Sequence, residues 1–210
     1  MTGLAPDGEA PGWLRELAAA ARTMTIPEAL IPPASGGRDA AVLVLFGEGD
    51  HGPDLLFIQR SDDLRLHAGQ PAFPGGGIDP QDGGPVQAAL REATEEVGID
   101  PGGVLVVGAL PEVYLHRTGF RVVPVLAWWQ RPSSVAPVDP AEVASVERVS
   151  VAELADPAVR VTVRLPIGRI GPGFQVKGML IWGFTAALVD RLLALGGWEK
   201  PWDPDRIVDL

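Results

Sequence analysis

The sequence predicts an α/β fold in which a mixed β-sheet lies between α-helices. Short apolar runs of strand length recur along the chain and are bounded by glycine, proline or aspartate. One helix with a single apolar stripe interrupts these runs, and one long apolar helix follows them. The chain has 210 residues, of which 46% are hydrophobic, so it can bury one sizeable core. Composition alone would predict only an α/β or α+β domain.

The expected elements divide the chain into three parts. Residues 1–38 form an N-terminal extension with a short amphipathic segment, residues 39–197 form the main domain, and residues 198–210 form a C-terminal tail. The expected strands are residues 40–46, 55–59, 104–110, 120–129, 146–151 and 161–165, the first two joined as a hairpin. Pro124 indicates a sheet edge or a bulge. We expect a helical turn at residues 152–156 and a long helix at residues 178–195.

The most informative segment is an acidic helix that is expected to begin at Pro85 and to end before Gly98. Proline suits the first helical position because its missing N–H leaves no bond unmade there, and glycine suits the left-handed residue that ends a helix. Apolar residues recur between them at helical spacing and define one stripe that must face a core, namely Val86, Ala89, Leu90, Ala93 and Val97.

The polar side of this helix carries two different pairs of residues. Glu92 and Glu96 lie on one flank, whereas Arg91 and Glu95 lie on the other. Two like charges one turn apart weaken an isolated helix, so a compensating cation is expected beside Glu92 and Glu96. Mg²⁺ takes oxygen ligands and is usually held by a few carboxylates together with substrate phosphates. The second pair predicts a salt bridge that holds the acids in place.

A run of glycines precedes the helix. Pro74, Gly75, Gly76 and Gly77 supply backbone that is almost free of Cβ atoms, so main-chain groups can approach an ion or a phosphate closely. Alone, such a run is more typical of an ordinary tight turn, and an acidic helix face is usually just solvated. Together, at this spacing, they are far more specific and predict a loop and a helix that bind metal or phosphate.

Gly77 and residues 91–99, which read REATEEVGI, resemble the Nudix box, the sequence motif of the Nudix hydrolase superfamily. One position departs from the family pattern, because Gly83 stands where a glutamate is usual, with Asp82 one residue earlier. The resemblance implies a mixed sheet between helices, with the box as a loop, a helix and a loop. It also implies hydrolysis of a diphosphate with Mg²⁺ or Mn²⁺ as the cofactor.

The resemblance implies roles for individual side chains. The expected metal ligands are Glu92, Glu95, Glu96 and Gly76, the last of these, or Gly77, through its carbonyl oxygen. Arg91 would orient Glu95 by a salt bridge. The general base varies among branches of the family, and Glu142 is the candidate here, with a solvated acid opening a helix or loop as the open alternative. Arg91, Glu95 and Glu142 are therefore the expected catalytic residues.

A second motif lies upstream and is similar to that of the Nudix branch acting on coenzyme A and its thioesters. From Arg60 the chain runs Arg60-Ser61, three residues, Arg65, three residues, Gly69, three residues, and then FPGG at residues 73–76. The start is looser, because residues 57–58 differ from the family's leucine and threonine. Coenzyme A carries a diphosphate and a 3′-phosphate, for which arginine offers a planar fork. The resemblance implies substrate binding by Arg60, Arg65, Gly69 and Gly75.

The expected function is metal-dependent hydrolysis of coenzyme A or acyl-coenzyme A to 4′-phosphopantetheine, or its acyl form, and adenosine 3′,5′-bisphosphate. Three alternatives stay open at this point. Arg60 and Arg65 could be surface residues paired with nearby acids. The substrate could be another nucleoside diphosphate derivative, such as ADP-ribose or NADH. The chain could also be a Nudix-fold binding protein without turnover, which the Gly83 departure favours and the intact run at residues 91–96 opposes.

Composition restricts the partners. The formal net charge of −10 argues against a nucleic-acid partner, which normally meets a basic stripe, so a phosphorylated small molecule is expected instead. The chain has no cysteine for disulfides or thiolate chemistry, and His51, His67 and His116 lack close partners for a zinc site. Without a secretory leader or a membrane span, the expected location is the cytoplasm. The sequence leaves open whether the chain forms a homodimer.

Overall fold

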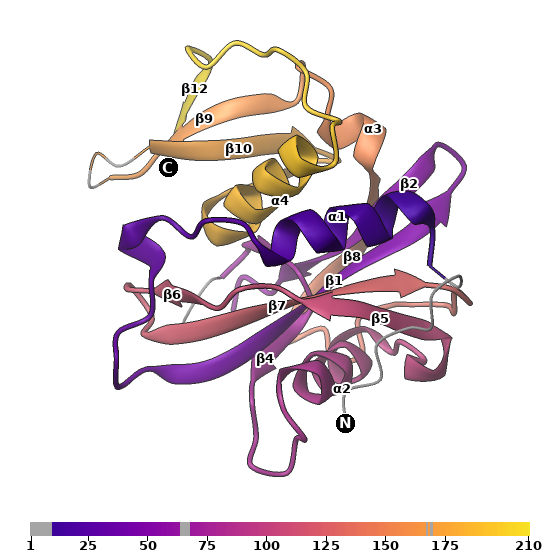
Figure 1. Ribbon diagram of the computed structural model, residues 1–210. Helices are drawn as coiled ribbons and strands as arrows, with labels where there is room; N and C mark the ends of the chain where they lie inside the picture. Colours follow the sequence, from indigo (N-terminus) through magenta and orange to yellow (C-terminus); the bar gives the residue numbers. More distant parts are fainter. Residues whose placement is uncertain (1–9, 64–67, 167, 169) are drawn as a thin grey trace.

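The computed structural model describes residues 10–63, 68–166, 168 and 170–210, which form two sheets and four α-helices (Figure 1). The larger sheet contains β1 (Arg38–Gly49), β2 (Gly52–Arg60), β3 (Pro71–Ala72), β4 (Gly75–Gly77), β5 (Val104–Ala109), β6 (Val113–Leu115), β7 (Phe120–Trp129) and β8 (Val143–Ser150). The smaller sheet contains β9 (Arg160–Arg164), β10 (Ile170–Val176), β11 (Met179–Ile181) and β12 (Ile207–Asp209). The helices are α1 (Gly12–Arg22), α2 (Pro85–Val97), α3 (Val151–Leu154) and α4 (Gly183–Leu195), with 3₁₀ turns at Glu28–Leu30 and Pro101–Gly103.

The centre of the larger sheet is the parallel pair of β1 and β7, in which Leu43 lies opposite Val125. β2 pairs antiparallel with β1 across a tight turn where Gly49 faces Gly52, and this confirms the predicted hairpin. The glycine strand β4 also pairs with β1, with Gly76 opposite Ala41, while β8 pairs with β2. The glycine run is thereby anchored directly to the central strand.

Pro124 does not lie at a sheet edge, which was one of the two alternatives expected for it. β7 lies between β1 and the two strands β5 and β6, and its residues before Pro124 pair with β6 whereas those after it pair with β5. At this seam the Pro124 carbonyl accepts a hydrogen bond from the Leu110 N–H at 2.8 Å. The missing N–H of proline falls where the ladder is already interrupted. A register shift does occur nearby, but it lies on β5 between Val106 and Gly108, opposite Ala127 and Leu126 of β7 rather than at Pro124.

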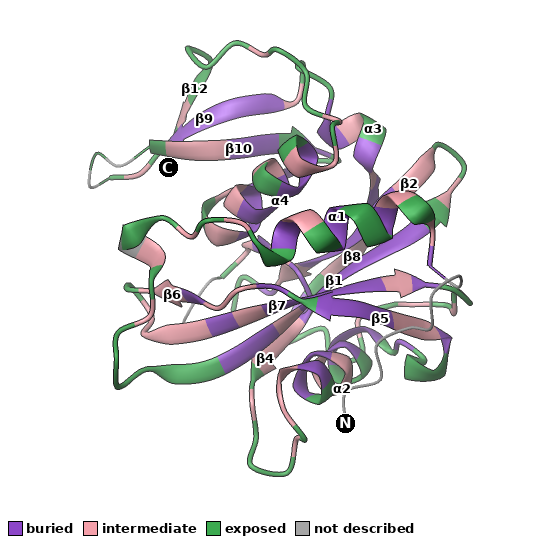
Figure 2. Cartoon of the chain, in the orientation of Figure 1, coloured by how far each residue is buried: buried purple, intermediate pink, exposed green. Residues whose placement is uncertain are grey.

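Two apolar cores cover the two faces of the larger sheet. Val44 and Phe46 of β1 belong to a core shared with α1 and α4, whereas Leu43 and Leu45 belong to a core shared with α2. Alternate residues of a strand point to opposite faces, so a central strand covered on both sides must be apolar throughout. Figure 2 shows this burial along the central strands and on the inward sides of the helices. The predicted arrangement of a mixed sheet between helices is confirmed.

The predicted long helix at residues 178–195 is wrong in its first turn. Residues Met179–Ile181 form β11, which pairs with β10, and the helix α4 begins only at Gly183. The cause is the turn before β11, in which Lys177 and Gly178 both have positive φ values of 49° and 75°. Two successive left-handed residues form the type of turn that joins the strands of a hairpin. Trp182 therefore precedes the first turn of α4.

Both ends of the described chain pack onto the fold. Leu14, Leu17 and Ala21 of α1 are buried in the same core as α4. Near the other end, β12 pairs in parallel with β9. In the described part of the chain, no helix has the length and apolar content needed to span a membrane.

Candidate active site

The acidic helix α2 is defined at both ends by the expected residues. Pro85 occupies the first helical position, and Gly98 adopts the left-handed conformation with a φ of 70° and donates its N–H to the Thr94 carbonyl. The apolar stripe faces the sheet, with Ala89 and Ala93 fully buried. The helix therefore has a fixed rotation about its axis, and this rotation sets where its acids lie.

The three glutamates of α2 lie in different environments. The Glu95 side chain is 59% exposed, whereas the Glu96 side chain is only 6% exposed. Glu96 accepts a hydrogen bond from the Gly75 N–H at 2.9 Å, and its Oε1 lies 3.6 Å from Nη1 of Arg60. Helical periodicity had placed Glu96 on the polar side. The contact with β4 buries it, because the glycine strand covers this end of the helix.

The glycines of β4 are needed for this contact. A Cβ atom at Gly75, where φ is 153°, would lie 2.3 Å from the Ala41 carbonyl oxygen. A Cβ atom at Gly76 would lie 2.5 Å from the carboxyl carbon of Glu92. Neither contact is possible between unbonded atoms at those distances. Gly75 therefore allows β4 to approach β1, and Gly76 allows the Glu92 carboxylate to lie against the main chain of the loop.

Arg91 connects the helix to the loop before it. Its Nη1 lies 2.9 Å from Oε2 of Glu95 and 3.0 Å from Oε1 of Glu92. Its Nη2 donates to the Gly77 carbonyl at 3.0 Å, and its Nε and Nη2 donate to the two carboxylate oxygens of Asp82, each at 3.0 Å. The predicted contact between Arg91 and Glu95 is present. Arg91 makes two parallel hydrogen bonds to Asp82 and only one to Glu95, so the pair with Asp82 has the more favourable geometry.

Asp82 was not predicted as a site residue. It lies directly before Gly83, the position at which the Nudix box usually has a glutamate, so its place in the sequence was the available indication. The Arg91 guanidinium holds the pKa of the Asp82 carboxyl below its usual range, with the Asp79 N–H as a second cause. Asp82 is thus ionised and bonded to Arg91. A charged partner for Arg91 is retained despite the departure at Gly83.

Burial raises the pKa values of the two acids that face the loop. The pKa of Glu96 rises to about 7, chiefly by burial, and the nearby carboxylates of Glu92 and Glu142 raise it further against the opposing Gly75 N–H and Arg60. Burial also raises the pKa of Glu92, while Arg91 opposes the rise. Negative charge is therefore crowded at the junction of α2 and β4. A nearby cation would relieve it.

The carboxylate and carbonyl oxygens at this junction are of the type that binds a hard divalent cation. They do not surround a single point. Among the described residues, no set of three or more histidine, aspartate or glutamate side chains is arranged to ligate a metal. Glu92 instead contacts Arg91, and Glu96 contacts Arg60 and the Gly75 N–H. Carboxylate and carbonyl oxygens are the ligands that Mg²⁺ and Mn²⁺ prefer. Glu92, Glu96 and the Gly76 carbonyl offer them within one small region.

Glu142 lies beside the end of β2, one residue before Val143, which pairs with Arg60. It is exposed, directly before β8, and its carbonyl accepts a hydrogen bond from the Ser61 N–H at 2.9 Å. Its charge contributes to the raised pKa of Glu96, which places its carboxylate near the acids of α2. The structure therefore brings Glu142 into the neighbourhood of the predicted metal ligands. Its role as the general base stays a prediction.

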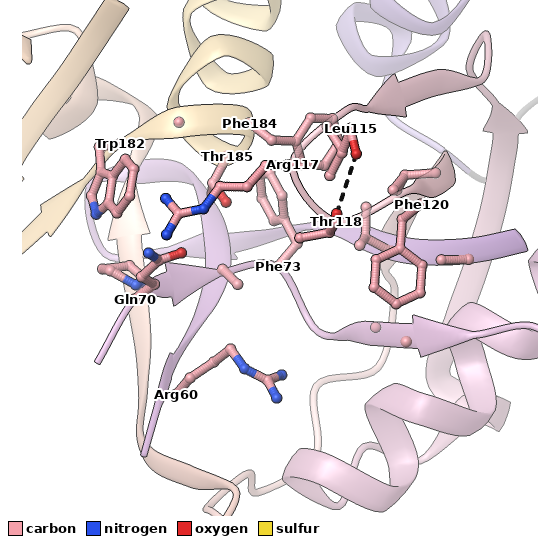
Figure 3. Close-up of a pocket in the computed structure, with 18 of the residues that line it drawn as sticks. Arg60, Gln70, Phe73, Leu115, Arg117, Thr118, Phe120, Trp182, Phe184 and Thr185 are labelled. Atoms are coloured by element: carbon pink, nitrogen blue, oxygen red, sulfur yellow. Dashed lines mark hydrogen bonds between the residues drawn. The ribbon is translucent and has the colours of Figure 1, made fainter. Parts of the chain in front are cut away.

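A cavity of about 470 Å³ opens beside Gly75, Gly76 and Arg60. Figure 3 shows Arg60 on the side of α2 and Arg117 on the side of α4. The lining is mostly apolar, with polar side chains from Arg60, Gln70, His116, Arg117, Thr118 and Thr185. A few polar groups in an apolar cleft of this size are typical of a small-molecule site. The sequence analysis did not predict that Arg117 and the start of α4 line this cavity.

The remaining predicted substrate-binding residues lie upstream of β4. Gly69 has a φ of 65° and lies in the connection from β2 to β3, where an added Cβ atom would lie 2.4 Å from Oδ1 of Asp62. Its N–H donates to the Ser61 carbonyl at 3.3 Å. This glycine allows the connection to fold tightly beside Arg60. Arg65, also predicted to bind substrate, and His67 lie outside the described residues.

Comparisons with known proteins agree with this geometry. Residues 37–165 match the sequence model of the NUDIX domain. The chain is 42% identical over 171 residues to a Cronobacter sakazakii protein called "Uncharacterized Nudix hydrolase NudL", covering 78% of this chain and 85% of that one. It is 39% identical over 173 residues to the protein of the same name from Escherichia coli K12, with the same coverage.

A similar fold is seen in solved structures. The Nudix hydrolase RenU from M. smegmatis superposes with a TM-score of 0.56 at 20% identity, covering 84% of this chain and 99% of that chain. At this identity the similarity shows the fold alone. The domain match extends over more than half of the sequence, and relatives of about 40% identity cover most of it. The chain therefore belongs to the Nudix hydrolase family.

Proposed function

We propose that the protein hydrolyses the diphosphate of coenzyme A or acyl-coenzyme A and requires Mg²⁺ or Mn²⁺. Water adds to one phosphorus atom while the bond from that atom to the bridging oxygen breaks. The products are 4′-phosphopantetheine, or its acyl form, and adenosine 3′,5′-bisphosphate. The motif at residues 60–76 supports this choice among Nudix substrates, because its members Arg60, Gly75 and Gly76 border both the acidic helix and the cavity.

The position of Arg60 is the observation on which the proposal rests. Its Nη1 lies 3.6 Å from Glu96, and its side chain also lines the cavity, so it joins the acidic helix to the space where a substrate fits. Its Nε atom is buried and has no hydrogen-bond partner within the described residues. The Arg60 guanidinium also lines the cavity, and its planar set of N–H donors is suited to a phosphate oxygen.

The other residues divide the remaining tasks. When bound, Mg²⁺ or Mn²⁺ supplies neutralisation of the diphosphate charge and a water of lowered pKa. Glu92, Glu96 and the Gly76 carbonyl would hold the ion. Arg91 fixes Glu92 and ties the helix to the loop before it. Glu142, beside Arg60, would accept the proton of the attacking water.

The test is incubation with coenzyme A, acetyl-coenzyme A, ADP-ribose and NADH under Mg²⁺ or Mn²⁺, with products identified by mass spectrometry. We expect adenosine 3′,5′-bisphosphate from the first two, at higher kcat/KM than any product from the others, and no product in a chelator. Preference for ADP-ribose or NADH would reject the substrate assignment. No turnover of any of the four would favour a binding protein.

Replacement of Arg60 tests the observation that carries the proposal. Arg60→Ala should raise KM for coenzyme A about tenfold or more, since a hydrogen bond between charged groups contributes roughly 1.5–3 kcal/mol. Arg15→Ala is the control, because Arg15 is exposed on α1 and does not line the cavity. Equal kinetics for the two variants would remove Arg60 from the binding site.

A further inference from the structure

A second cavity of about 440 Å³ lies next to the first. Its walls come from the segment after α1, from the seam of the sheet at Val113 and Pro124, and from the middle of α4 at Ala187 and Leu188. The lining is mostly apolar, so the cavity suits an apolar group rather than a nucleotide or a phosphate.

Leu30 and Phe184 line both cavities. They form a shared wall between the space beside Arg60 and the space beside Ala187. Phe184 comes from the first turn of α4 and is half-buried (Figure 3). A wall made of two side chains can be crossed by an elongated ligand if those side chains change rotamer, and such changes are fast compared with turnover.

Charged side chains line both cavities. In the first cavity, Arg60 lies away from Phe184 and next to the acids of α2, whereas the exposed Arg117 lies nearer to Phe184 (Figure 3). In the second cavity, Asp190 and Arg191 follow Ala187 and Leu188 along α4; Asp190 pairs with Arg160, and Arg191 is exposed. The remaining lining on both sides of Leu30 and Phe184 is mainly apolar. This order of polar, apolar and polar surfaces matches a ligand with a charged head and a long apolar tail.

We propose that the second cavity is an acyl subsite, which binds the fatty acyl chain of an acyl-coenzyme A whose diphosphate lies beside Arg60. The inference rests on the proposed function and specifies its substrate as thioesters of medium-length acyl chains in preference to free coenzyme A. The pantetheine arm occupies the first cavity, and the acyl chain passes between Leu30 and Phe184. The acyl chain ends at the part of the second cavity lined by Asp190 and Arg191. The methylene groups of longer acyl chains extend beyond it into water.

The proposal predicts the effect of chain length in the unmodified protein. Each buried methylene group contributes about 0.8 kcal/mol, which corresponds to a factor of about four in kcat/KM as an upper value. We expect kcat/KM to rise about tenfold or more from acetyl- to octanoyl-coenzyme A and to level off before palmitoyl-coenzyme A. Equal values across the series would overturn the acyl subsite.

A variant that fills the second cavity tests its location. Ala187 is half-buried on α4 and lines only the second cavity, so Ala187→Phe should place a ring inside it. We expect kcat/KM for octanoyl-coenzyme A to fall about tenfold, to the level of free coenzyme A. We expect kcat/KM for free coenzyme A to stay within about twofold of that of the unmodified protein. Ala194→Phe is the control, because Ala194 is exposed on the same helix and lines neither cavity.

The outcomes separate this inference from the proposed function. Lack of turnover of free and acylated coenzyme A by the unmodified protein would reject the proposed function and the acyl subsite with it. Normal turnover of free coenzyme A with a flat chain-length series would reject the subsite alone. An equal loss for free and octanoyl-coenzyme A in Ala187→Phe, with thermal unfolding unchanged, would also reject it, because the cavity would then hold the pantetheine arm.

Discussion

Helices α2 and α4 flank the larger sheet on opposite faces, yet their contributions to the site differ (Figure 1). The α2 side carries charged groups held by specific contacts, such as those of Arg91 with Asp82 and of Glu96 with Gly75. The α4 side carries mainly apolar surface that shapes two cavities. The charged groups of the candidate site are thus held mainly on the α2 side of the sheet, and the apolar cavity walls lie mainly on the α4 side. Substitutions on the two sides should therefore change different quantities.

Glu96→Gln is expected to have the largest effect. Loss of groups that only support a metal ligand typically costs 10- to 100-fold in activity, so loss of a ligand charge should lower kcat/KM by at least about 100-fold. The fold should persist, because glutamine can still accept the Gly75 N–H bond. Steady-state kinetics with a metal titration measures the effect, and Glu16→Gln on the exposed side of α1 is the control. Near-normal activity of Glu96→Gln would contradict the metal assignment.

The raised pKa of Glu96 predicts how stability depends on pH when metal is removed by a chelator. The carboxyl has a pKa of about 7 in the folded protein, above its ordinary value of 4.5, so the fold favours the protonated form. This contribution, about 3 kcal/mol, is fully present below pH 4.5 and is lost as pH rises through 7. Glu96→Gln should remove this pH dependence and be more stable than the unmodified protein at pH 8. Urea unfolding at pH 5, 6, 7 and 8 checks both statements.

The three glycines of β4 should respond differently to alanine. Gly75→Ala should lower the free energy of unfolding by about 1–3 kcal/mol, because the new Cβ meets main chain that cannot move aside. Gly76→Ala should fold but lose activity, since its Cβ displaces the flexible Glu92 side chain. Gly77→Ala is the matched control, because a Cβ atom added there would meet no atom within 4 Å beyond its chain neighbours. Thermal unfolding with kinetics on all three distinguishes these outcomes, and equal behaviour would contradict the assigned contacts.

Arg117→Ala is expected to have the smallest effect, on the cavity side of the comparison. Arg117 is exposed at the rim, and exposed ion pairs contribute roughly 0.2–1 kcal/mol, so KM for coenzyme A should rise at most about fivefold with kcat unchanged. High salt should reduce the difference from the unmodified protein. A large fall in kcat would instead assign Arg117 to the chemical step. It would contradict the expectation that substitutions on the α4 side of the sheet change binding alone.

The two sides of the sheet also differ in how far the sequence predicts them. The ends of α2 follow from Pro85 and Gly98, and strand β7 matches the apolar run at residues 120–129, because these features depend on local patterns. The burial of Glu96 was not predictable from helical periodicity, since it depends on β4 packing across the helix end. Asp82 is close in sequence to the expected glutamate, but only the fold shows that it reaches Arg91.

The cavities were beyond prediction for a related reason. Their walls join segments that are far apart in the sequence, such as Leu30, His116 and Phe184, and no local spacing relates these residues. The start of α4 was also misplaced, because an apolar run after a glycine fits a strand or a helix equally well until its neighbour β10 is known. Local motifs thus predicted the acidic helix and its glycine loop, whereas the cavity lining became known only from the assembled fold.

The seam at Pro124 has a consequence for how such proteins diversify. One half of β7 is registered with β5, while the other half is registered with β6, which leads into the loop that carries Arg117. Insertions or exchanges in that loop can alter ligand preference without shifting the alignment of β5 or of the central parallel pair. Related proteins can therefore evolve different ligand preferences through this loop while the central strands and the acidic helix α2 stay unchanged.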